Sequence, residues 1–401
     1  MSKLHHILML SHGLGSYYRA RGYAQHLVER GYQVDVVTVS EQNLFRPVVE
    51  EFKGVRIIHS PDLLWGRLRT GWDPWDCAWR ILRLLKHPVD LIKCYETRPV
   101  SVLPAFALKQ SLKVPVVMSW GDWWGRGGTT TERSTGFAHR LDQFFSPVET
   151  FFEETFQRFA DGLIVLSDAL LHRAIDLGIP EHKIRIIVPG VDSDRVCPGD
   201  RAAARKLLGI AEDRFLYGYA GSLFPRDAEL LLDAHRKVLA RLPNATAVLI
   251  GHTRLRRLPE ATENLISTGG KLSYETVLQW FAACDVLLLP LCHSIANRGR
   301  WPSKVAEYMA AGRPVVATAV GDLTKLFADG AAGVLTAANA ESFAQGILKI
   351  YANPHRDDMG RKGREIACSQ LHWRVQTDLV QEFLEQVYEE AQRPHPQPQY
   401  A

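Results

Sequence analysis

Several features that mark other classes of protein are absent from this sequence. No apolar run reaches the ~18 residues needed to span a bilayer. The amino-terminal segment MSKLHHILMLSHGLG has only a short apolar core, interrupted by histidines, unlike a signal peptide. The six cysteines are scattered without a CxxC pair, which favours reduced thiols over a disulfide or zinc framework. We therefore expect a cytoplasmic protein.

Strong charge and internal repetition are also lacking. The formal net charge of +4 is too small to indicate nucleic acid as a partner, and no segment repeats. What remains is ordinary globular composition, with 46% hydrophobic and 23% charged residues over 401 positions. At the usual ~150 residues per domain, this length predicts about two domains.

Apolar runs alternate with amphipathic helical patterns along the chain, as in parallel βαβ units. In the first half, runs typical of strands are His6 to Leu10, Gln33 to Val39, Val55 to His59, Leu91 to Tyr95, Pro115 to Ser119, Ile164 to Leu166 and Arg185 to Val188. A segment rich in charge, Pro and Gly, Ser193 to Arg201, then indicates a linker. A second alternating set follows, with strands at Leu216 to Ala220, Ala247 to Ile250, Val286 to Leu289, Val315 to Ala317 and Gly333 to Leu335.

This organisation predicts an α/β protein of two doubly wound, Rossmann-like domains, residues 1–192 and 193–372. A final helix is expected within 373–392, and the Pro-rich tail 393–401 is expected to be disordered. Open parallel sheets bind ligands at the carboxyl ends of their strands. We therefore expect the two domains to face one another across a cleft that holds the active site.

The most informative segment is WPSKVAEYMAAGRPVVAT, from Trp301 to Thr318. Pro302 suits the first turn of a helix, Ser303 is expected to cap it, and Gly312 is expected to end it. Lys304 falls in the first turn, where a cation opposes the helix dipole unless an anion lies nearby. The pattern therefore predicts that Lys304 contacts a phosphate.

Glu307 lies one turn beyond Lys304 on the same helix face. A carboxylate there can accept hydrogen bonds from a pair of sugar hydroxyls. A diphosphate together with a ribose indicates a nucleotide. The alternative is an amphipathic helix that carries a surface Lys–Glu pair, and the spacing alone does not separate the two.

The segment resembles the donor-binding motif of the retaining glycosyltransferases of family 4. In these enzymes, a glutamate before a small-residue-Gly-x-Pro-Val-Val run holds the nucleotide ribose. Similar pieces occur in family order at Arg19 to Thr38, Val165 to Asp192, Gly218 to Ala234 and in HWRVQTDLVQEFLEQVYEEA near the carboxyl terminus. The resemblance implies the GT-B fold, with the donor in the second domain, the acceptor in the first, and the last helix crossing back to the first domain.

The resemblance implies an enzyme of hexosyltransferase type (EC 2.4) that moves a sugar from a nucleotide-diphosphate sugar to a glycan or lipid-linked acceptor. No side chain is clearly placed as a nucleophile, so front-face attack is expected, without a cofactor. Asp192-Ser193-Asp194 matches a short metal-binding pattern of other glycosyltransferases, but such short matches are frequent by chance and we assign no metal. Two alternatives stay open: a nucleotide-sugar 2-epimerase of the same architecture, and a catalytically silent partner subunit.

Glycine turns follow the first strand of each domain. Gly13 and Gly15 lack the third glycine that a nicotinamide-binding turn requires, because position 18 is Tyr18; we expect their backbone to approach the donor. One of the two arginines that follow, Arg19 and Arg21, is a further candidate for the cleft, although solvated arginines are commoner.

In the second domain the turn is Gly221-Ser222, where family members carry an arginine after the glycine and a lysine further on. Here Ser222 and Asp227 stand in those positions. Arginine can hold phosphate bidentately, so we expect Arg226 and Lys304 to form the diphosphate clamp, with Arg298 and Arg300 as alternatives. Ser303, next to Lys304, is a further expected contact of the donor.

Two family side chains are missing. Family members carry a pair of glutamates, and the first of the two is replaced here by Gly299. The backbone N–H of Gly299 can still donate to a phosphate or a sugar hydroxyl. Asn297 is expected to take over part of the recognition of the sugar. The family histidine near the sugar is Gly121, and Asp122 beside it is expected to contact the donor sugar or the acceptor hydroxyl. The competing interpretation is that Asp122 only caps the turn.

The segment Leu63 to His87 interleaves aromatic and basic residues: Trp65, Trp72, Trp75 and Trp79 with Arg67, Arg69, Arg80 and Arg83. Helices that lie on anionic lipid have this composition. Packing against the domain is the alternative. The pattern therefore leaves open peripheral contact between 63–87 and the inner face of a membrane.

Overall fold

The computed structural model describes residues 3–40, 45–63, 70–132, 136–251 and 263–393. The chain divides into two compact units. The first comprises Met1–Gly125, Pro147–Pro189 and Trp373–Ala401, and the second comprises Arg126–Ser146 and Gly190–His372. From position 394 onward, the tail that we expected to be disordered lies outside the described residues.

Among the described residues, the first unit has an eight-stranded sheet in the order β3-β4-β2-β1-β5-β6-β7-β8. All neighbouring strands are parallel except β3 and β4, which form an antiparallel hairpin at one edge. The strands are β1 His6–Leu10, β2 Gln33–Val39, β3 Val48–Phe52, β4 Val55–Ser60, β5 Leu91–Tyr95, β6 Val116–Trp120, β7 Gly162–Val165 and β8 Ile184–Ile186. The central strands are buried on both faces, which explains why most of their residues are apolar.

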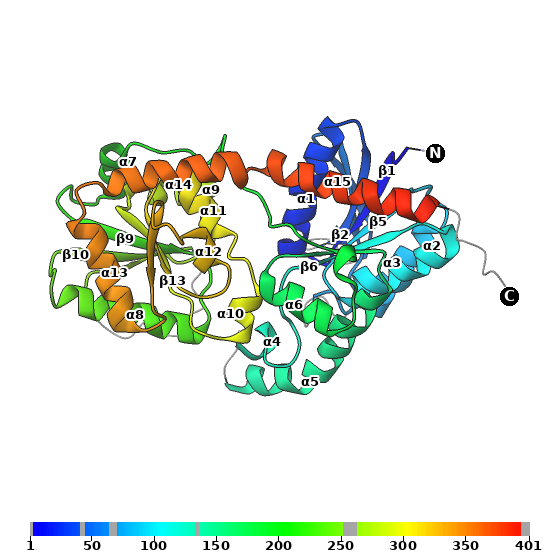
Figure 1. Cartoon of the computed structure of the whole chain (residues 1–401), viewed down its shortest axis with the longest axis horizontal. Helices are drawn as coiled ribbons and strands as arrows, with labels where there is room; N and C mark the ends of the chain where they lie inside the picture. The colour runs from blue at the N-terminus through cyan, green and yellow to red at the C-terminus, as the bar shows by residue number, and fades with distance from the viewer. Residues whose placement is uncertain (1–2, 41–44, 64–69, 133–135, 252–262, 394–401) are drawn as a thin grey trace. The chain divides into compact units, whose positions relative to one another are not determined.

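Helices cover the sheet, and the last helix of the chain packs on α1 in this unit (Figure 1). The helices are α1 Leu14–Glu29, α2 Pro74–Leu84, α3 Pro99–Leu112, α6 Asp168–Asp176 and α15 Trp373–Gln392. Helix α5, Gly136–Thr155, belongs to the second unit up to Ser146 and to the first unit from Pro147 onward. Residue 22 must be glycine for α15 to approach, because a Cβ there would lie 2.6 Å from the Trp373 ring. The carboxyl-terminal helix thus belongs to the first unit, as the resemblance implies.

The second unit contains, in its described part, an all-parallel six-stranded sheet in the order β11-β10-β9-β12-β13-β14. Its strands are β9 Phe215–Ala220, β10 Ala245–Ile250, β11 Leu265–Ser267, β12 Val286–Leu289, β13 Val315–Thr318 and β14 Gly333–Thr336. Its helices are α4 Thr129–Glu132, α7 Arg201–Leu208, α8 Pro225–Leu239, α9 Tyr274–Ala283, α10 Ile295–Gly299, α11 Lys304–Ala310, α12 Leu323–Leu326, α13 Ala340–Ala352 and α14 Arg356–Gln370. Both units therefore have the predicted doubly wound α/β architecture.

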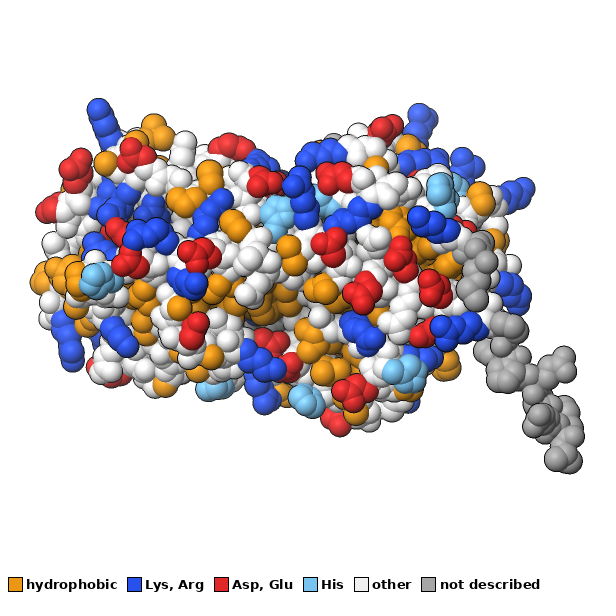
Figure 2. All heavy atoms as spheres, turned by 45° about the horizontal axis from the view of Figure 1, so that its top comes forward, with side chains coloured by type: hydrophobic (Ala, Val, Ile, Leu, Met, Phe, Trp, Pro, Cys, Tyr) orange, Lys and Arg blue, Asp and Glu red, His pale blue; other side chains and the backbone are white. Residues whose placement is uncertain are grey.

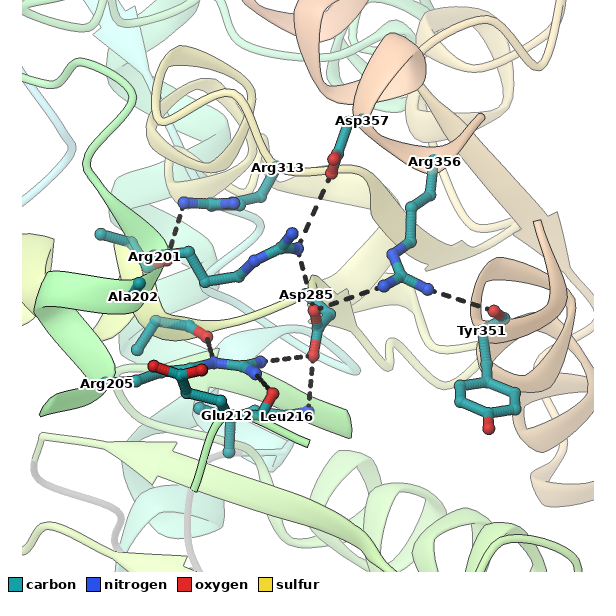
Figure 3. Close-up of polar contacts among 12 residues, drawn as sticks. Arg201, Ala202, Arg205, Glu212, Leu216, Asp285, Arg313, Tyr351, Arg356 and Asp357 are labelled. Atoms are coloured by element: carbon teal, nitrogen blue, oxygen red, sulfur yellow. Dashed lines mark hydrogen bonds and ion pairs between the residues drawn. The ribbon is translucent and has the colours of Figure 1, made fainter. Parts of the chain in front are cut away.

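A buried carboxylate ties several elements of the second unit together (Figure 3). Asp285, just before β12, is 4% exposed. It accepts from Arg205 at 2.7 Å, from Arg201 at 3.0 Å and from the backbone N–H of Leu216 at 2.8 Å. Because Asp285 precedes β12, this cluster lies at the amino end of the strand. It stabilises the junction of α7 with the sheet and is not placed where parallel sheets bind ligands.

The segment Leu63 to His87 only partly fits the predicted basic and aromatic surface. Positions 64–69, which include Trp65, Arg67 and Arg69, lie outside the described residues. Arg80 is fully buried and donates to Asp76 at 2.9 Å and to the Ser11 carbonyl at 2.8 Å. Its inclusion in a lipid-facing surface was therefore wrong, because its guanidinium neutralises a buried carboxylate of its own helix.

The surface carries both signs of charge. On the face shown in Figure 2, Lys and Arg side chains are interspersed with Asp and Glu over each unit. This mixture agrees with the modest net charge of the chain.

Candidate active site

Polar contacts join the carboxyl end of β9 to the start of α11. Lys304, the first residue of α11, donates from Nζ to the Tyr219 hydroxyl at 2.6 Å, and the ammonium lies 4.3 Å from the centre of the same ring. That hydroxyl donates to the Ser222 carbonyl oxygen at 2.8 Å. Lys304 is therefore held at the carboxyl edge of a parallel sheet, where α/β proteins bind ligands.

The turn after β9 brings backbone close to this ammonium. Gly221 has a φ of +93°, in the left-handed region that favours glycine, and its N–H donates to the Ile250 carbonyl at 2.8 Å. A Cβ at Gly221 would lie 3.4 Å from Lys304 Nζ. Of the predicted donor-binding residues, Gly221, Ser222 and Lys304 are thus brought together.

Glu307 lies one turn along α11 and is half-buried. Its Oε1 accepts a hydrogen bond from the Tyr274 hydroxyl at 2.7 Å; its Oε2 accepts none from the part of the chain that the structure describes. Burial raises the pKa of the Glu307 carboxyl, and the Tyr274 hydrogen bond and the charge of Lys304 oppose that rise. The arrangement fixes one carboxylate oxygen and leaves the other available to a ligand.

The start of α11 differs from the prediction at Ser303. Ser303 has helical dihedral angles, φ −48° and ψ −28°, and its side chain makes no capping hydrogen bond. An N-cap needs extended dihedral angles for its hydroxyl to reach the N–H groups of the first turn. The helix instead begins with a tight turn, in which Val305 N–H donates to the Pro302 carbonyl at 2.8 Å. The capping role of Ser303, and the place of Pro302 within the first turn, were therefore wrong, whereas Gly312 ends the helix at a φ of +68°.

Asn297 is turned into a buried cluster. Its Nδ2 donates to Asp227 at 2.9 Å and to the Cys292 carbonyl at 3.0 Å, and its side chain is 2% exposed. Asp227 also pairs with Arg300 at 3.3 Å, and burial raises the pKa of Asp227. In the structure, therefore, Asn297 orients α10 against α8, and its role in sugar recognition stays a prediction.

Arg226 and Gly299 are placed differently from Lys304. The Arg226 guanidinium is 59% exposed and lies 3.7 Å from the Glu132 carboxylate on α4. Gly299 is the buried last residue of α10. The structure thus gives Arg226 a carboxylate partner, and the clamp of Arg226 with Lys304 stays a prediction.

In the first unit, the turn Gly13 to Ser16 lies at the carboxyl end of β1. Gly13 precedes α1 with a φ of +147°, and a Cβ there would lie 3.0 Å from the Thr70 side chain. A Cβ at Gly15 would meet no atom within 4 Å. Ser16 is buried and bonds to the Gly13 carbonyl at 3.0 Å. A side chain at position 15 would therefore find open space, and the approach of the donor to this backbone stays a prediction.

An ion pair lies beside Gly121, the position at which family members carry a histidine. The Arg19 guanidinium contacts the Glu96 carboxylate, and a Cβ at Gly121 would lie 2.3 Å from Arg19 and 2.5 Å from Glu96. The Trp124 indole N–H donates a hydrogen bond to Glu96 Oε2 at 3.0 Å. Asp122 is half-buried, and its charge opposes the lowering of the Arg19 pKa by burial. Arg19 and Glu96 occupy the space of a side chain at position 121, so a larger residue there would require these two side-chain ends to shift.

Three residues of these clusters escaped the sequence analysis: Tyr219, Tyr274 and Glu96. Tyr219 lies within the segment Gly218 to Ala234 but was given no role there, whereas Tyr274 and Glu96 lie outside the family-like segments. Each of the three contacts a residue far away along the chain. Asp192 and Asp194, which matched a short metal-binding pattern, lie in the structure with His372 in a group of potential ligands. Our expectation that the reaction needs no metal is not tested by this grouping.

Comparison with known proteins decides the family. The model described as Glycosyltransferase Family 4 matches residues 18–195, and the model described as Glycosyl transferases group 1 matches residues 214–353. The chain belongs to these glycosyltransferases. The second match contains Lys304 and Glu307, and the first contains Arg19 and Gly121.

Curated relatives match over part of their length. D-inositol 3-phosphate glycosyltransferase of Kribbella flavida is 30% identical over 240 residues, which cover 55% of each chain. The protein of the same name from Geodermatophilus obscurus is 33% identical over 189 residues, 44% of this chain and 42% of that protein. This chain thus spans about half the length of the curated relatives it matches.

Solved structures match over nearly the whole chain. Sucrose-phosphate synthase from Thermosynechococcus elongatus has a TM-score of 0.75 at 18% identity, covering 96% of this chain and 100% of that one. Anabaena Alr3699/HepE, in complex with UDP-glucose, has a TM-score of 0.68 at 18% identity, covering 95% and 99%. WaaG, a glycosyltransferase involved in lipopolysaccharide biosynthesis, has a TM-score of 0.68 at 20% identity, covering 94% and 99%. The fold of this chain is therefore GT-B.

Proposed function

We propose that this chain is a retaining glycosyltransferase that moves a sugar from a nucleotide-diphosphate sugar to a glycan or lipid-linked acceptor, without a metal or cofactor in the reaction. The observation that carries the proposal is the arrangement at the start of α11. There, Lys304 is held beside the Gly221-Ser222 turn, and Glu307 lies one turn further on. A cation and a carboxylate at this spacing suit the diphosphate and the ribose of one nucleotide.

The donor side of the proposal assigns one role to each group. Lys304 binds the diphosphate beside the Gly221-Ser222 turn, and the free Oε2 of Glu307 accepts hydrogen bonds from the ribose. The first unit takes the acceptor, with the Asp122 carboxylate as a contact, while the backbone at Gly13 and Gly15 keeps the role of donor contact expected from the sequence. Arg226 joins the phosphate site only if it leaves Glu132, from which it lies 3.7 Å away.

The proposed reaction is a front-face displacement. The acceptor oxygen forms a bond to the anomeric carbon on the side that the diphosphate leaves, and the acceptor proton passes to a leaving phosphate oxygen. Negative charge grows on the diphosphate as the glycosidic bond breaks. Lys304 stabilises this charge most strongly in the transition state, which is where such a cation accelerates the reaction.

Nucleotide binding tests this proposal first. We expect calorimetry to show saturable binding of either uridine or guanosine diphosphate, with UDP-glucose as the first donor because HepE binds it. With donor and a set of glycan and lipid-linked acceptors, a new glycoside should appear. Free sugar released from donor without acceptor would indicate the 2-epimerase instead. Failure of all these nucleotides to bind would favour the silent partner subunit.

We further propose that the outer face of α2 contacts anionic lipid. Trp75 is 52% exposed and Leu82 is 73% exposed, and Arg83 and Lys86 are exposed beside them. An apolar stripe bordered by cations is typical of helices that lie on a membrane surface. No described helix is sufficiently long and apolar to pass through a membrane.

Liposome flotation tests this contact. The chain should bind vesicles containing anionic lipid and not neutral vesicles, and added salt should weaken binding because screening acts over ~8 to 10 Å at physiological ionic strength. Replacing Trp75 and Leu82 by serine should abolish flotation. The control is Leu207→Ser on α7, which removes an equally exposed leucine, 66% exposed. Equal recovery of the native chain with neutral and anionic vesicles would refute the contact.

A further inference from the structure

Two histidines and an aspartate converge at one edge of the first unit's sheet. His6 is the first residue of β1, Asp35 is the third residue of β2, and His87 lies between α2 and β5. Strands β1 and β2 are parallel, so His6 and Asp35 lie near the amino ends of these strands. The turn at Gly13 follows the carboxyl end of β1, at the opposite edge. The cluster is thus separate from the candidate active site.

The three side chains have the geometry of ligands to one ion. His6 Nε2 lies 3.0 Å from Asp35 Oδ2, and His87 Nε2 contacts the same oxygen. One ligand atom from each residue lies within 4.8 Å of the others. The two imidazole rings meet edge to face, with their centres 5.3 Å apart. Both rings therefore present the same nitrogen to a common point.

Burial makes the carboxylate unusual. The Asp35 side chain is 1% exposed, with His6 at 9% and His87 at 23%. The second carboxylate oxygen of Asp35, Oδ1, is buried and has no hydrogen-bond partner among the described residues. A buried carboxylate oxygen without a partner costs free energy. The two imidazoles both meet Oδ2 and leave this cost unrelieved, whereas a cation bound by the carboxylate would offset it.

We propose that His6, Asp35 and His87 bind a Zn²⁺ ion. Imidazole nitrogen and carboxylate oxygen are zinc ligands, and three protein ligands leave a fourth position for water. Since Zn²⁺ takes the lone pair of each Nε2, the imidazole proton stands on Nδ1 in the bound form. The fourth position opens on the side of His87, the most exposed of the three. The ion links β1, β2 and the segment after α2, and it takes no part in sugar transfer.

One neighbouring group opposes the ion. The Arg56 guanidinium lies 3.9 Å from Asp35 Oδ2 and its side chain is 49% exposed. A cation this close competes with Zn²⁺ for the carboxylate. Because about half of the Arg56 side chain is exposed to solvent, the guanidinium can turn away from Asp35 when the ion binds.

Calorimetry with ZnCl₂ on the full chain tests the proposal. The protein is prepared without a polyhistidine tag, treated with EDTA and returned to chelator-free buffer. One saturable site is expected, and His87→Asn should weaken it by at least about tenfold. The matched control is His59→Asn. His59 has nearly the same exposure, 22%, and bonds one carboxylate, Glu50, at 3.0 Å, so its loss should leave the affinity unchanged.

Further variants separate this site from other ligands. Asp35→Asn should also weaken binding by at least about tenfold, while Arg56→Gln should bind Zn²⁺ more tightly because the competing cation is gone. Asp194→Asn, which removes a ligand from the Asp192, Asp194 and His372 group, should bind as the native chain does. No saturable binding by the native chain, or binding that survives both His87→Asn and Asp35→Asn, would overturn the proposal and leave a hydrogen-bonded triad.

Discussion

Lys304→Ala should lower turnover about a hundredfold to a thousandfold, the usual effect of removing one group that stabilises charge in a transition state. The ammonium is fixed by the Tyr219 hydroxyl at 2.6 Å, so it needs no reorganisation as the diphosphate leaves. Affinity for the nucleotide should fall much less than turnover, because the charge of the diphosphate is largest in the transition state. Steady-state kinetics together with calorimetry on the same variant would measure both quantities.

Two further variants control this experiment. Lys304→Arg keeps the charge and should recover part of the turnover. Lys237→Ala removes a helical lysine of the same unit that is paired with Glu341 at 2.9 Å, and it should leave turnover unchanged. A folded Lys304→Ala variant with full turnover would show that Lys304 is only surface charge, and the proposed reaction would then lose its main catalytic group.

The parallel strands could be predicted because burial on both faces imposes continuous apolar runs. His6 to Leu10 and Leu91 to Tyr95 have the bounds predicted from sequence. Strand β3 was missed because four of its five residues are exposed, and Glu50 and Glu51 interrupt the apolar run that Val48 and Val49 begin. Gly54 was the sequence signal that could have identified this hairpin, because a two-residue hairpin turn favours glycine. In the structure, Lys53 and Gly54 have φ of 50° and 76°.

The candidate site could be predicted only where its parts are close in sequence. Lys304 and Glu307 lie on one helix, so their shared face follows from the helical repeat. Tyr219 and Tyr274 meet them from β9 and α9, and such contacts depend on how the elements pack. The same limit applies to Asn297, whose inward orientation follows from the buried carboxylate of Asp227. Spacing along the chain could not indicate that partner.

Gly121 shows how a departure from a family pattern acquires a physical meaning. From sequence, it was only a missing histidine. In the structure, a side chain at this position would overlap the Arg19 and Glu96 pair. A larger residue at this position would therefore require both side-chain ends to shift. Removing only one of the two charges would leave the other buried without its partner.

Glu307→Gln should weaken nucleotide binding about tenfold to a hundredfold, since a hydrogen bond to a charged acceptor contributes roughly 1.5 to 3 kcal/mol. Glutamine keeps the size of the side chain and can still accept from Tyr274, so the fold should be preserved. Glu275→Gln is the matched control. Glu275 neighbours Tyr274 in sequence, is 67% exposed and pairs with Arg195, so its change should leave the affinity unaltered. Calorimetry with the nucleotide that binds the native chain gives the comparison.

The pH dependence of nucleotide affinity, measured for the native chain and for Glu307→Gln, tests whether the charged Glu307 carboxylate is the form that binds. Burial raises the pKa of Glu307, so its proton binds at a higher pH than the ~4.3 of an ordinary glutamate. The protonated carboxyl accepts less well from two ribose hydroxyls, and native affinity should fall as the pH drops through that raised pKa. Glu307→Gln cannot titrate and should lack this step, while any protonation of the nucleotide phosphate affects both proteins alike. Identical pH profiles for the two proteins would remove Glu307 from the ribose site.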